Sequence, residues 1–305
     1  MLRTFRIVEG KLAESDAEKA QLLVYVCPDE KDRAALINQS AIDEHNLNSS
    51  FDPEELGRTE FENDHFVTII KKPKRYSSQD NFHFKVSSIG LFLYESKLIV
   101  LADEDLPWEG RVFSKLHSLH DIYLKIIYIC IIHFEEHLRV IRKVSEELES
   151  AINLAFSNKD LLHLFKLEKS LVYYLDAINS NSKVIEKLKL NATKIGFSHI
   201  IQESLEDLII EGAQCFQQAN SYSQVLASLM DARASIINNN LNIRIRTLTI
   251  LSLCIMTPTL VVSIFSMNVS LPIPPNFETH AFWLVLGLAS VSVSAVLLLW
   301  FYRKL

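Results

Sequence analysis

The chain contains few of the residues that build tight turns, phosphate loops or disulfide frameworks. Its 305 residues include 7 glycines, 8 prolines and 4 cysteines. It has no glycine-rich phosphate loop, so a nucleotide-binding fold of that kind is not supported. The cysteines show no paired spacing, which predicts reduced thiols rather than disulfides; they are Cys27, Cys130, Cys215 and Cys254.

Basic clusters and catalytic signatures are also missing. The net charge of −6, with no cluster of Lys and Arg, argues against nucleic acid as a partner. No Ser/His/Asp nucleophile signature is present, so we do not expect an enzyme. Residues 1–10 mix charges with single apolar residues, and we therefore expect no signal peptide there.

What the chain does have is two long apolar runs near its C-terminus. Residues 247–265 and 281–302 contain no charged residue. Each is close to the roughly 20 residues that a helix needs to cross the hydrocarbon layer. Backbone groups in that layer find no water, so each run is predicted to be a transmembrane helix. Residues 266–280 then form the connecting loop of a two-helix hairpin.

Positive charge predicts the orientation of this hairpin. Arg244 and Arg246 precede the first run, Arg303 and Lys304 follow the second, and the loop has neither Lys nor Arg. Positive residues stay on the cytoplasmic side. We therefore expect a multi-pass protein of the plasma (inner) membrane, with residues 1–246 and the basic tail 303–305 cytoplasmic and the loop extracytoplasmic.

The part before the membrane shows two patterns. Residues 21–28 and 65–73 are short β-rich runs, and residues 82–103 read as a hairpin that turns at residues 94–97. Residues 29–42 are predicted to be a helix. From about residue 111 apolar residues recur at helical spacing, with a break at residues 157–160. A further helix is predicted from near His199 into the membrane.

A largely polar stripe of side chains begins just before the first apolar run and continues along it. They alternate three and four residues apart, which places them on one helix face. The stripe consists of Asn242, Ile245, Thr249, Ser252, Met256, Thr259, Ser263 and Ser266. Such a stripe has two interpretations: tight packing between membrane helices, or one wall of a water-filled path that several subunits enclose.

The end of the stripe resembles a known family. Residues 258–272, PTLVVSIFSMNVSLP, resemble the signature of the CorA family of magnesium and cobalt transporters. In that family the first membrane helix ends in Tyr or Phe followed by Gly-Met-Asn. Here Met267 and Asn268 match, whereas Ser266 replaces the glycine. Residues 229–250 are similar to the family's cytoplasmic approach to the membrane.

The resemblance implies a fold and an assembly. The fold class is an α+β cytoplasmic domain with a long helical stalk and a C-terminal transmembrane hairpin, assembled as a homo-pentameric funnel. The expected divisions are residues 1–110 for the α/β domain, 111–191 for paired antiparallel helices, 192–246 for the stalk, and then the hairpin. The implied function is a divalent-cation channel, for Mg²⁺ or Co²⁺, along the pentamer axis.

The resemblance also implies which residues meet the ion. Mg²⁺ gives up its waters reluctantly, so a ring of Asn268 amides can hold the hydrated ion without stripping it. Ser266, Met267 and Asn268 form the selectivity loop. The implied pore-lining residues are Asn242, Ile245, Leu248, Thr249, Ser252, Met256, Thr259 and Ser263.

A regulatory metal site is implied in the stalk. Family members use a stalk aspartate in an inter-subunit magnesium site that holds the channel closed, and Asp207 is the matching position. An acid that caps the helix or faces solvent explains Asp207 equally well. Asp80 is the partner that we assign from the α/β domain.

Three alternatives stay open from the sequence. A Zn²⁺ or Ni²⁺ transporter of the same fold is one, since ligand softness does not decide the ion. A membrane-anchored scaffold that has lost transport is another, because of Ser266. His133 and His137 match the H-x-x-E-H pattern of zinc peptidases, but a solvated polar helix face is our interpretation of that segment. His117 and His120 offer at most a weak metal site.

Overall fold

The computed structural model describes residues 1–77, 80, 82–108, 110, 112–152, 158–267 and 278–302. The chain divides into two compact units, Met1–Met230 and Asp231–Leu305. The first unit holds a sheet and the helices that pack on it. The second holds the two apolar helical segments.

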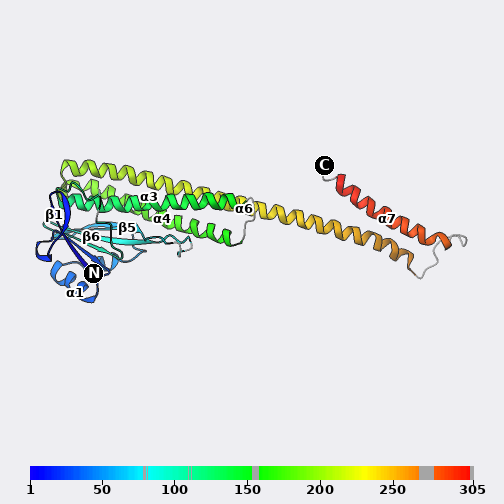
Figure 1. The fold of residues 1–305 in the computed structure, drawn as a ribbon, viewed down its shortest axis with the longest axis horizontal. Coiled ribbons are helices and arrows are strands. Elements are labelled where there is room, and N and C mark those ends of the chain that lie inside the picture. Colours follow the sequence, from blue (N-terminus) through cyan, green and yellow to red (C-terminus); the bar gives the residue numbers. More distant parts are fainter. Residues whose placement is uncertain are drawn as a thin grey trace. The chain divides into compact units, whose positions relative to one another are not determined.

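A seven-stranded mixed sheet forms the centre of the N-terminal unit (Figure 1). Its order is β2-β1-β3-β7-β6-β5-β4. The pair β3 and β7 is parallel, and the other neighbouring pairs are antiparallel. The strands are β1 (Leu2–Val8), β2 (Lys11–Glu14), β3 (Leu22–Val26), β4 (Arg58–Phe61), β5 (His65–Pro73), β6 (Val86–Tyr94) and β7 (Leu98–Ala102).

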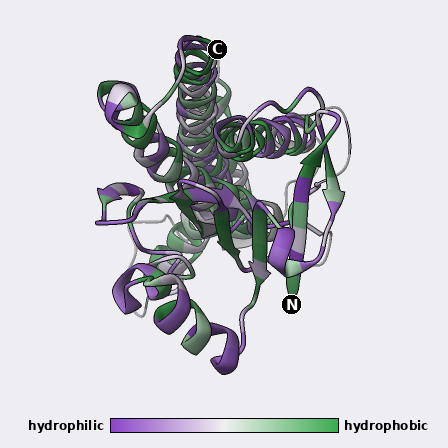
Figure 2. Ribbon diagram, turned by 90° about the vertical axis from the view of Figure 1, so that its left-hand side faces the viewer, coloured by the Kyte–Doolittle hydropathy of each residue, from purple (hydrophilic) through white to green (hydrophobic). Residues whose placement is uncertain are grey.

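Both faces of the sheet are covered, and β5 shows how. Successive side chains of a strand point to opposite faces. Phe66 and Ile70 belong to a large core with the long helices, whereas Val67 and Ile69 belong to a smaller core with the short helices α1 (Glu30–Ser40) and α2 (Glu44–Ser49). Every residue of β5 is therefore buried. Figure 2 shows the hydrophobic residues along these central strands.

Two long helices, α3 (Leu119–Ile152) and α4 (Asn158–Leu190), pack against β5 and against each other. The hydroxyl of Tyr123 on α3 lies 2.7 Å from that of Thr68 on β5, deep in the core. The short helix α5 (Ala192–Ile195) follows and ends at Gly196, whose φ of 86° is the left-handed conformation typical of a glycine cap.

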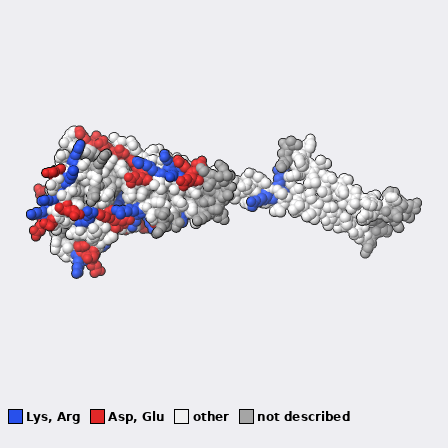
Figure 3. All heavy atoms as spheres, in the orientation of Figure 1, with Lys and Arg blue, Asp and Glu red and all other residues white. Residues whose placement is uncertain are grey.

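The chain then continues as α6 (His199–Phe265), a helix of 67 residues, and later as α7 (Glu278–Tyr302). Both helices contain a segment long and apolar enough to cross a membrane. In Figure 3 charged side chains cover the N-terminal unit, whereas the C-terminal part of α6 and α7 show almost none. This agrees with a membrane environment for these two segments.

Several elements match the sequence predictions. The run at residues 21–28 contains β3, the run at 65–73 is β5, and residues 82–103 form the β6–β7 hairpin with its turn after Tyr94. The helix predicted from near His199 begins there. An α/β unit, a long helix and two apolar C-terminal helices are thus confirmed, while the number of subunits stays a prediction.

Candidate functional site

The predicted pore residues all lie on the C-terminal part of α6. Each of the eight is exposed in the single chain; they are Asn242, Ile245, Leu248, Thr249, Ser252, Met256, Thr259 and Ser263. Their exposure leaves the whole stripe without a covering element among the described residues. A partner outside the single chain, or lipid, has to meet this face.

A different face of the same helix is partly covered. The half-buried positions are Ile250, Cys254, Thr257, Pro258, Val261 and Phe265. An α-helix turns by roughly 100° per residue, so these positions centre on the side roughly opposite the polar stripe. The less exposed side of this part of α6 is therefore not the side that carries the stripe.

The hydroxyl groups of the stripe are partly satisfied within the helix. Thr249 Oγ1 donates to the carbonyl of Ile245 at 2.9 Å, and Thr259 Oγ1 donates to that of Ile255 at 2.6 Å. Ser and Thr side chains in membrane helices commonly donate such hydrogen bonds to a carbonyl of the preceding turn. The lone-pair electrons of these oxygens still face outward, so the hydroxyls can accept hydrogen bonds from the waters of a hydrated ion.

Ser266, where the family has glycine, continues the helical hydrogen bonding. Its backbone N–H donates to the carbonyls of Val262 (3.0 Å) and Ser263 (3.2 Å), and its hydroxyl donates to Val262 (2.9 Å). It is not among the residues with positive φ. The serine thus fits here without a left-handed backbone. Met267 is exposed, and Asn268 lies outside the described residues.

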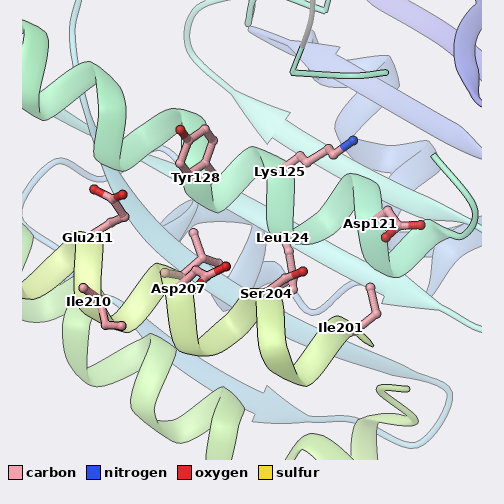
Figure 4. Close-up of a pocket in the computed structure, with 10 residues that line it drawn as sticks. Asp121, Leu124, Lys125, Tyr128, Ile201, Ser204, Asp207, Ile210 and Glu211 are labelled. Carbon is pink, nitrogen blue, oxygen red and sulfur yellow. The ribbon is translucent and has the colours of Figure 1, made fainter. Parts of the chain in front are cut away.

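Asp207 lines a groove of about 400 Å³ between α3 and α6 (Figure 4). Asp121 of α3 and Glu211 of α6 line the same groove. The ammonium group of Lys125, which lines the groove too, donates to the carbonyl of Ser114. Burial lowers the pKa of Lys125, and Asp121 opposes that shift.

The neighbouring stalk acids are engaged elsewhere. Glu206 pairs with Lys189 at 2.9 Å, and Glu203 lies 3.2 Å from Nδ1 of His199. Asp80 accepts hydrogen bonds from the backbone and hydroxyl of Ser77, which lower its pKa. Asp80 is not among the residues that line the Asp207 groove. Their pairing across subunits stays a prediction.

Sequence reasoning missed Asp121. Its carboxylate accepts from the backbone N–H groups of His117 (2.7 Å) and Ser118 (2.8 Å), and so caps the start of α3. The Ser-x-x-Asp spacing of a capping box was visible in the sequence. That this cap lines the same groove as Asp207 depends on how α3 and α6 pack, which the spacing does not reveal.

Within the H-x-x-E-H pattern His137 belongs to the core, so the predicted solvated face is wrong for this residue, whereas Glu136 is exposed. Nδ1 of His137 lies 2.6 Å from the hydroxyl of Tyr174 on α4, and only 7% of the surface of His137 is exposed. Burial lowers the pKa of His137 to about 4, which keeps the ring neutral. In the described part of the chain no three His, Cys, Asp or Glu side chains are grouped to hold a metal.

The four cysteines are free thiols, as predicted. Cys130 and Cys215 are buried, and burial raises the pKa of each to about 12. A thiol with such a pKa is not a nucleophile at neutral pH. Cys130 and Cys215 therefore pack in the core and are not reactive thiols.

Comparison with known proteins connects these features. A family model described as CorA-like Mg²⁺ transporter protein matches residues 22–303. The chain is 25% identical over 300 residues to the cobalt/magnesium transport protein CorA of Methanocaldococcus jannaschii, covering 94% of this chain and 92% of that protein.

Solved structures share the fold. The complete structure of the CorA magnesium transporter from M. jannaschii matches with a TM-score of 0.80 and 22% identity, over 98% of this chain and 96% of that one. The ZntB cytoplasmic domain from Vibrio parahaemolyticus matches with a TM-score of 0.58 and 13% identity, over 78% of this chain and 98% of that one.

Proposed function

Since the chain belongs to the family of CorA-like Mg²⁺ transporter proteins, we propose that it carries divalent cations across a membrane, with Mg²⁺ as the principal ion. The family match includes both apolar helices and nearly all of the N-terminal unit. The M. jannaschii relative is named for cobalt and magnesium transport, which supports Mg²⁺ and Co²⁺ as cargo. The chain is a transporter and not an enzyme.

The observation that carries this proposal is the exposed polar stripe on α6. It lies on the side roughly opposite the partly covered face. Polar groups facing lipid are unfavourable, and a closed ring of copies removes them from lipid. Several α6 helices around an axis would turn the stripe inward and enclose a path, and we propose five copies.

The proposed ion path suits a hydrated dication. Mg²⁺ keeps several waters when proteins bind it. A ring of Asn268 amides at the mouth would accept hydrogen bonds from those waters, and neutral oxygens would let the ion leave again. Below the ring, the hydroxyls of Thr259 and Thr249 and the amide of Asn242 would serve the same purpose, with Met256 and Leu248 as apolar constrictions.

Ser266 does not argue for a scaffold that has lost transport. A glycine replaced at a position of positive φ would distort the mouth, but Ser266 has helical hydrogen bonds and no positive φ. The hydroxyl stands at the end of the stripe, two residues before Asn268 in the sequence. We therefore favour transport over a scaffold, with Zn²⁺ or Ni²⁺ as the alternative cargo.

The orientation and the control of transport are parts of the same proposal. Arg244 and Arg246 before the first span support a cytoplasmic location for residues 1–246. The acids Asp207, Glu211 and Asp121 share one groove of that part. With a neighbouring subunit's acid, such as Asp80, Asp207 would bind Mg²⁺ from the cytoplasm and favour the closed state.

Two measurements test the proposal. Purified chain in mild detergent should have the mass of a closed oligomer, by our proposal a pentamer, whereas a monomer would exclude the enclosed path. Proteoliposomes should take up Mg²⁺ faster than empty liposomes, and the same assay with Co²⁺, Ni²⁺ and Zn²⁺ ranks the ions. Absence of uptake of any of these ions by intact oligomers would support the scaffold.

A further inference from the structure

A second groove of the N-terminal unit has a different charge from the Asp207 groove. It has a volume of about 470 Å³ and lies between the β5–β6 connection and α4. Its cationic lining comprises Lys71, Lys74, His83, Lys85 and Lys169. These residues come from two segments of the chain that only the fold brings together.

The two walls of this groove are fixed to each other. The backbone N–H of Phe84 donates to Ser170 Oγ of α4 at 3.1 Å, and Phe84 is buried. The N–H of Lys74 donates to the carbonyl of Lys85 at 2.9 Å, which joins the two ends of the connection. The two segments that carry the cationic side chains are therefore held in a fixed arrangement. Such pre-organisation lowers the entropic cost of binding a ligand.

Two of the lysines are already balanced within the fold. The buried ammonium group of Lys71 donates to Pro53 O and Ser88 Oγ, both at 2.9 Å. The acids of the same groove, Glu54 and Asp176, act on this ammonium and oppose the lowering of its pKa by burial. Lys74 pairs with Asp103 at 2.8 Å.

The other two lysines of the groove form no such ion pair in the described part of the chain. Among the described residues, no carboxylate forms an ion pair with Lys85 or Lys169, and both are exposed. Lys169 does lie near the ring of Tyr173, with its Nζ 5.9 Å from the centroid. The groove therefore has a region of excess positive charge next to an exposed aromatic ring.

The pKa of His83 reflects this positive charge. Burial lowers the pKa of His83; Lys85, Lys169 and Lys166 lower it further, and Asp80 opposes these effects. Three like charges that act on one imidazole repel one another, and a bound anion would relieve the repulsion. The same anion would favour protonation of His83 and thereby gain a further donor.

We propose that this groove binds a small phosphate-bearing anion, with its oxygens held by His83, Lys85 and Lys169 and its organic part against Tyr173. Lysine ammonium groups bind phosphate well as point charges, and a phosphate offers several strong acceptor oxygens to donors that converge from two walls. Tyr173 is 51% exposed and presents a ring to which a flat group can stack. The site lies on the sheet-and-helix unit and uses none of the residues proposed for the ion path.

The test is calorimetric titration of the full-length chain in detergent with inorganic phosphate and with AMP, at constant ionic strength. We expect saturable binding of both, tighter for AMP because of Tyr173. The double variant Lys85→Gln/Lys169→Gln should weaken both by at least about 10-fold, the loss of roughly two charge-assisted contacts. Lys183→Gln, an exposed lysine of the same helix, is the matched control and should bind like wild type.

Tyr173→Leu separates the two parts of the ligand. It should weaken AMP binding and leave inorganic phosphate unchanged. The proposal is overturned if the wild-type chain binds neither probe, or if the double variant binds both as wild type does. It is also overturned if Lys183→Gln loses as much affinity as the double variant, since the effect would then be one of net charge.

Discussion

The side-chain amide of Asn181 forms two hydrogen bonds with the backbone of Lys71, and these take the place of the bonds that a neighbouring strand would form. Asn181 Oδ1 accepts from the N–H of Lys71 at 2.7 Å, and Asn181 Nδ2 donates to its carbonyl at 2.8 Å. The last residue of β5 with a β4 partner is Ile69, opposite Arg58. Helix α4 therefore satisfies the edge of β5 where β4 has ended.

We expect Asn181→Ala to destabilise the N-terminal unit by about 2–4 kcal/mol, because a buried N–H and a buried carbonyl each lose their partner. Denaturant unfolding of the detergent-solubilised chain measures the loss. Asn179→Ala, at an exposed position of the same helix, should change stability by less than about 0.5 kcal/mol. Equal effects of the two substitutions would show that the Asn181 bonds contribute nothing.

This bond illustrates which parts of the fold the sequence allowed us to predict. Strong patterns were sufficient for β5 and for the β6–β7 hairpin, because long apolar runs and a polar turn are local signals. The hairpin of β1 and β2, with its turn at Glu9 and Gly10, was missed because its strands alternate weakly and β2 has four residues. Buried Lys71 and Lys72 in β5 depend on partners distant in the chain.

The candidate site likewise has one part that the sequence predicted and another part that it did not. The stripe on α6 follows from residue spacing within one helix, so sequence alone predicted it. The presence of Asp207 and Asp121 in one groove, and the burial of His137 against Tyr174, depend on which helix faces meet. A single sequence contains no direct record of such pairings, and the same applies to the lysines near His83.

Stability should depend on pH through His137. Burial lowers its pKa to about 4, while the unfolded chain has the ordinary value near 6.5. Between these values the unfolded state binds a proton that the native state does not, so stability falls as pH decreases from about 6.5 towards 4. The contribution lost is about 3 kcal/mol.

Replacing His137 with Gln should flatten this dependence, since Gln does not titrate and can still reach Tyr174. The measurement is the denaturation midpoint at several pH values between 4 and 7. His199→Gln, at an exposed position where the ring lies beside Glu203, should keep the wild-type slope. An unchanged slope in His137→Gln would mean that other groups determine the acid sensitivity.

Ser266→Gly should keep transport and alter ion preference or affinity. The serine has ordinary helical hydrogen bonds, so glycine relieves no left-handed conformation and removes a hydroxyl two residues before Asn268 in the sequence. Competition between Mg²⁺, Co²⁺ and Ni²⁺ in uptake assays measures the change. A glycine variant with much greater Mg²⁺ uptake and unchanged preference would show instead that serine impairs the mouth.

Asp207→Asn should weaken closure by cytoplasmic Mg²⁺. Removing one carboxylate from a group of acids lowers their attraction for a dication, so flux should persist at Mg²⁺ concentrations that inhibit the wild type. Glu206→Gln is the control, because that carboxylate already pairs with Lys189. If both variants are inhibited at the same Mg²⁺ concentration as the wild type, Asp207 caps the stalk helix or faces solvent and does not regulate transport.

The central claim is that divalent cations pass along the α6 stripe and through a ring of Asn268 amides. Initial Mg²⁺ flux into proteoliposomes, measured for Asn268→Ala beside Asn276→Ala from the same loop, tests it most directly. We predict that Asn268→Ala loses nearly all flux while its oligomer mass stays normal, and that Asn276→Ala retains most of it. Wild-type flux from the Asn268→Ala oligomer would contradict this account.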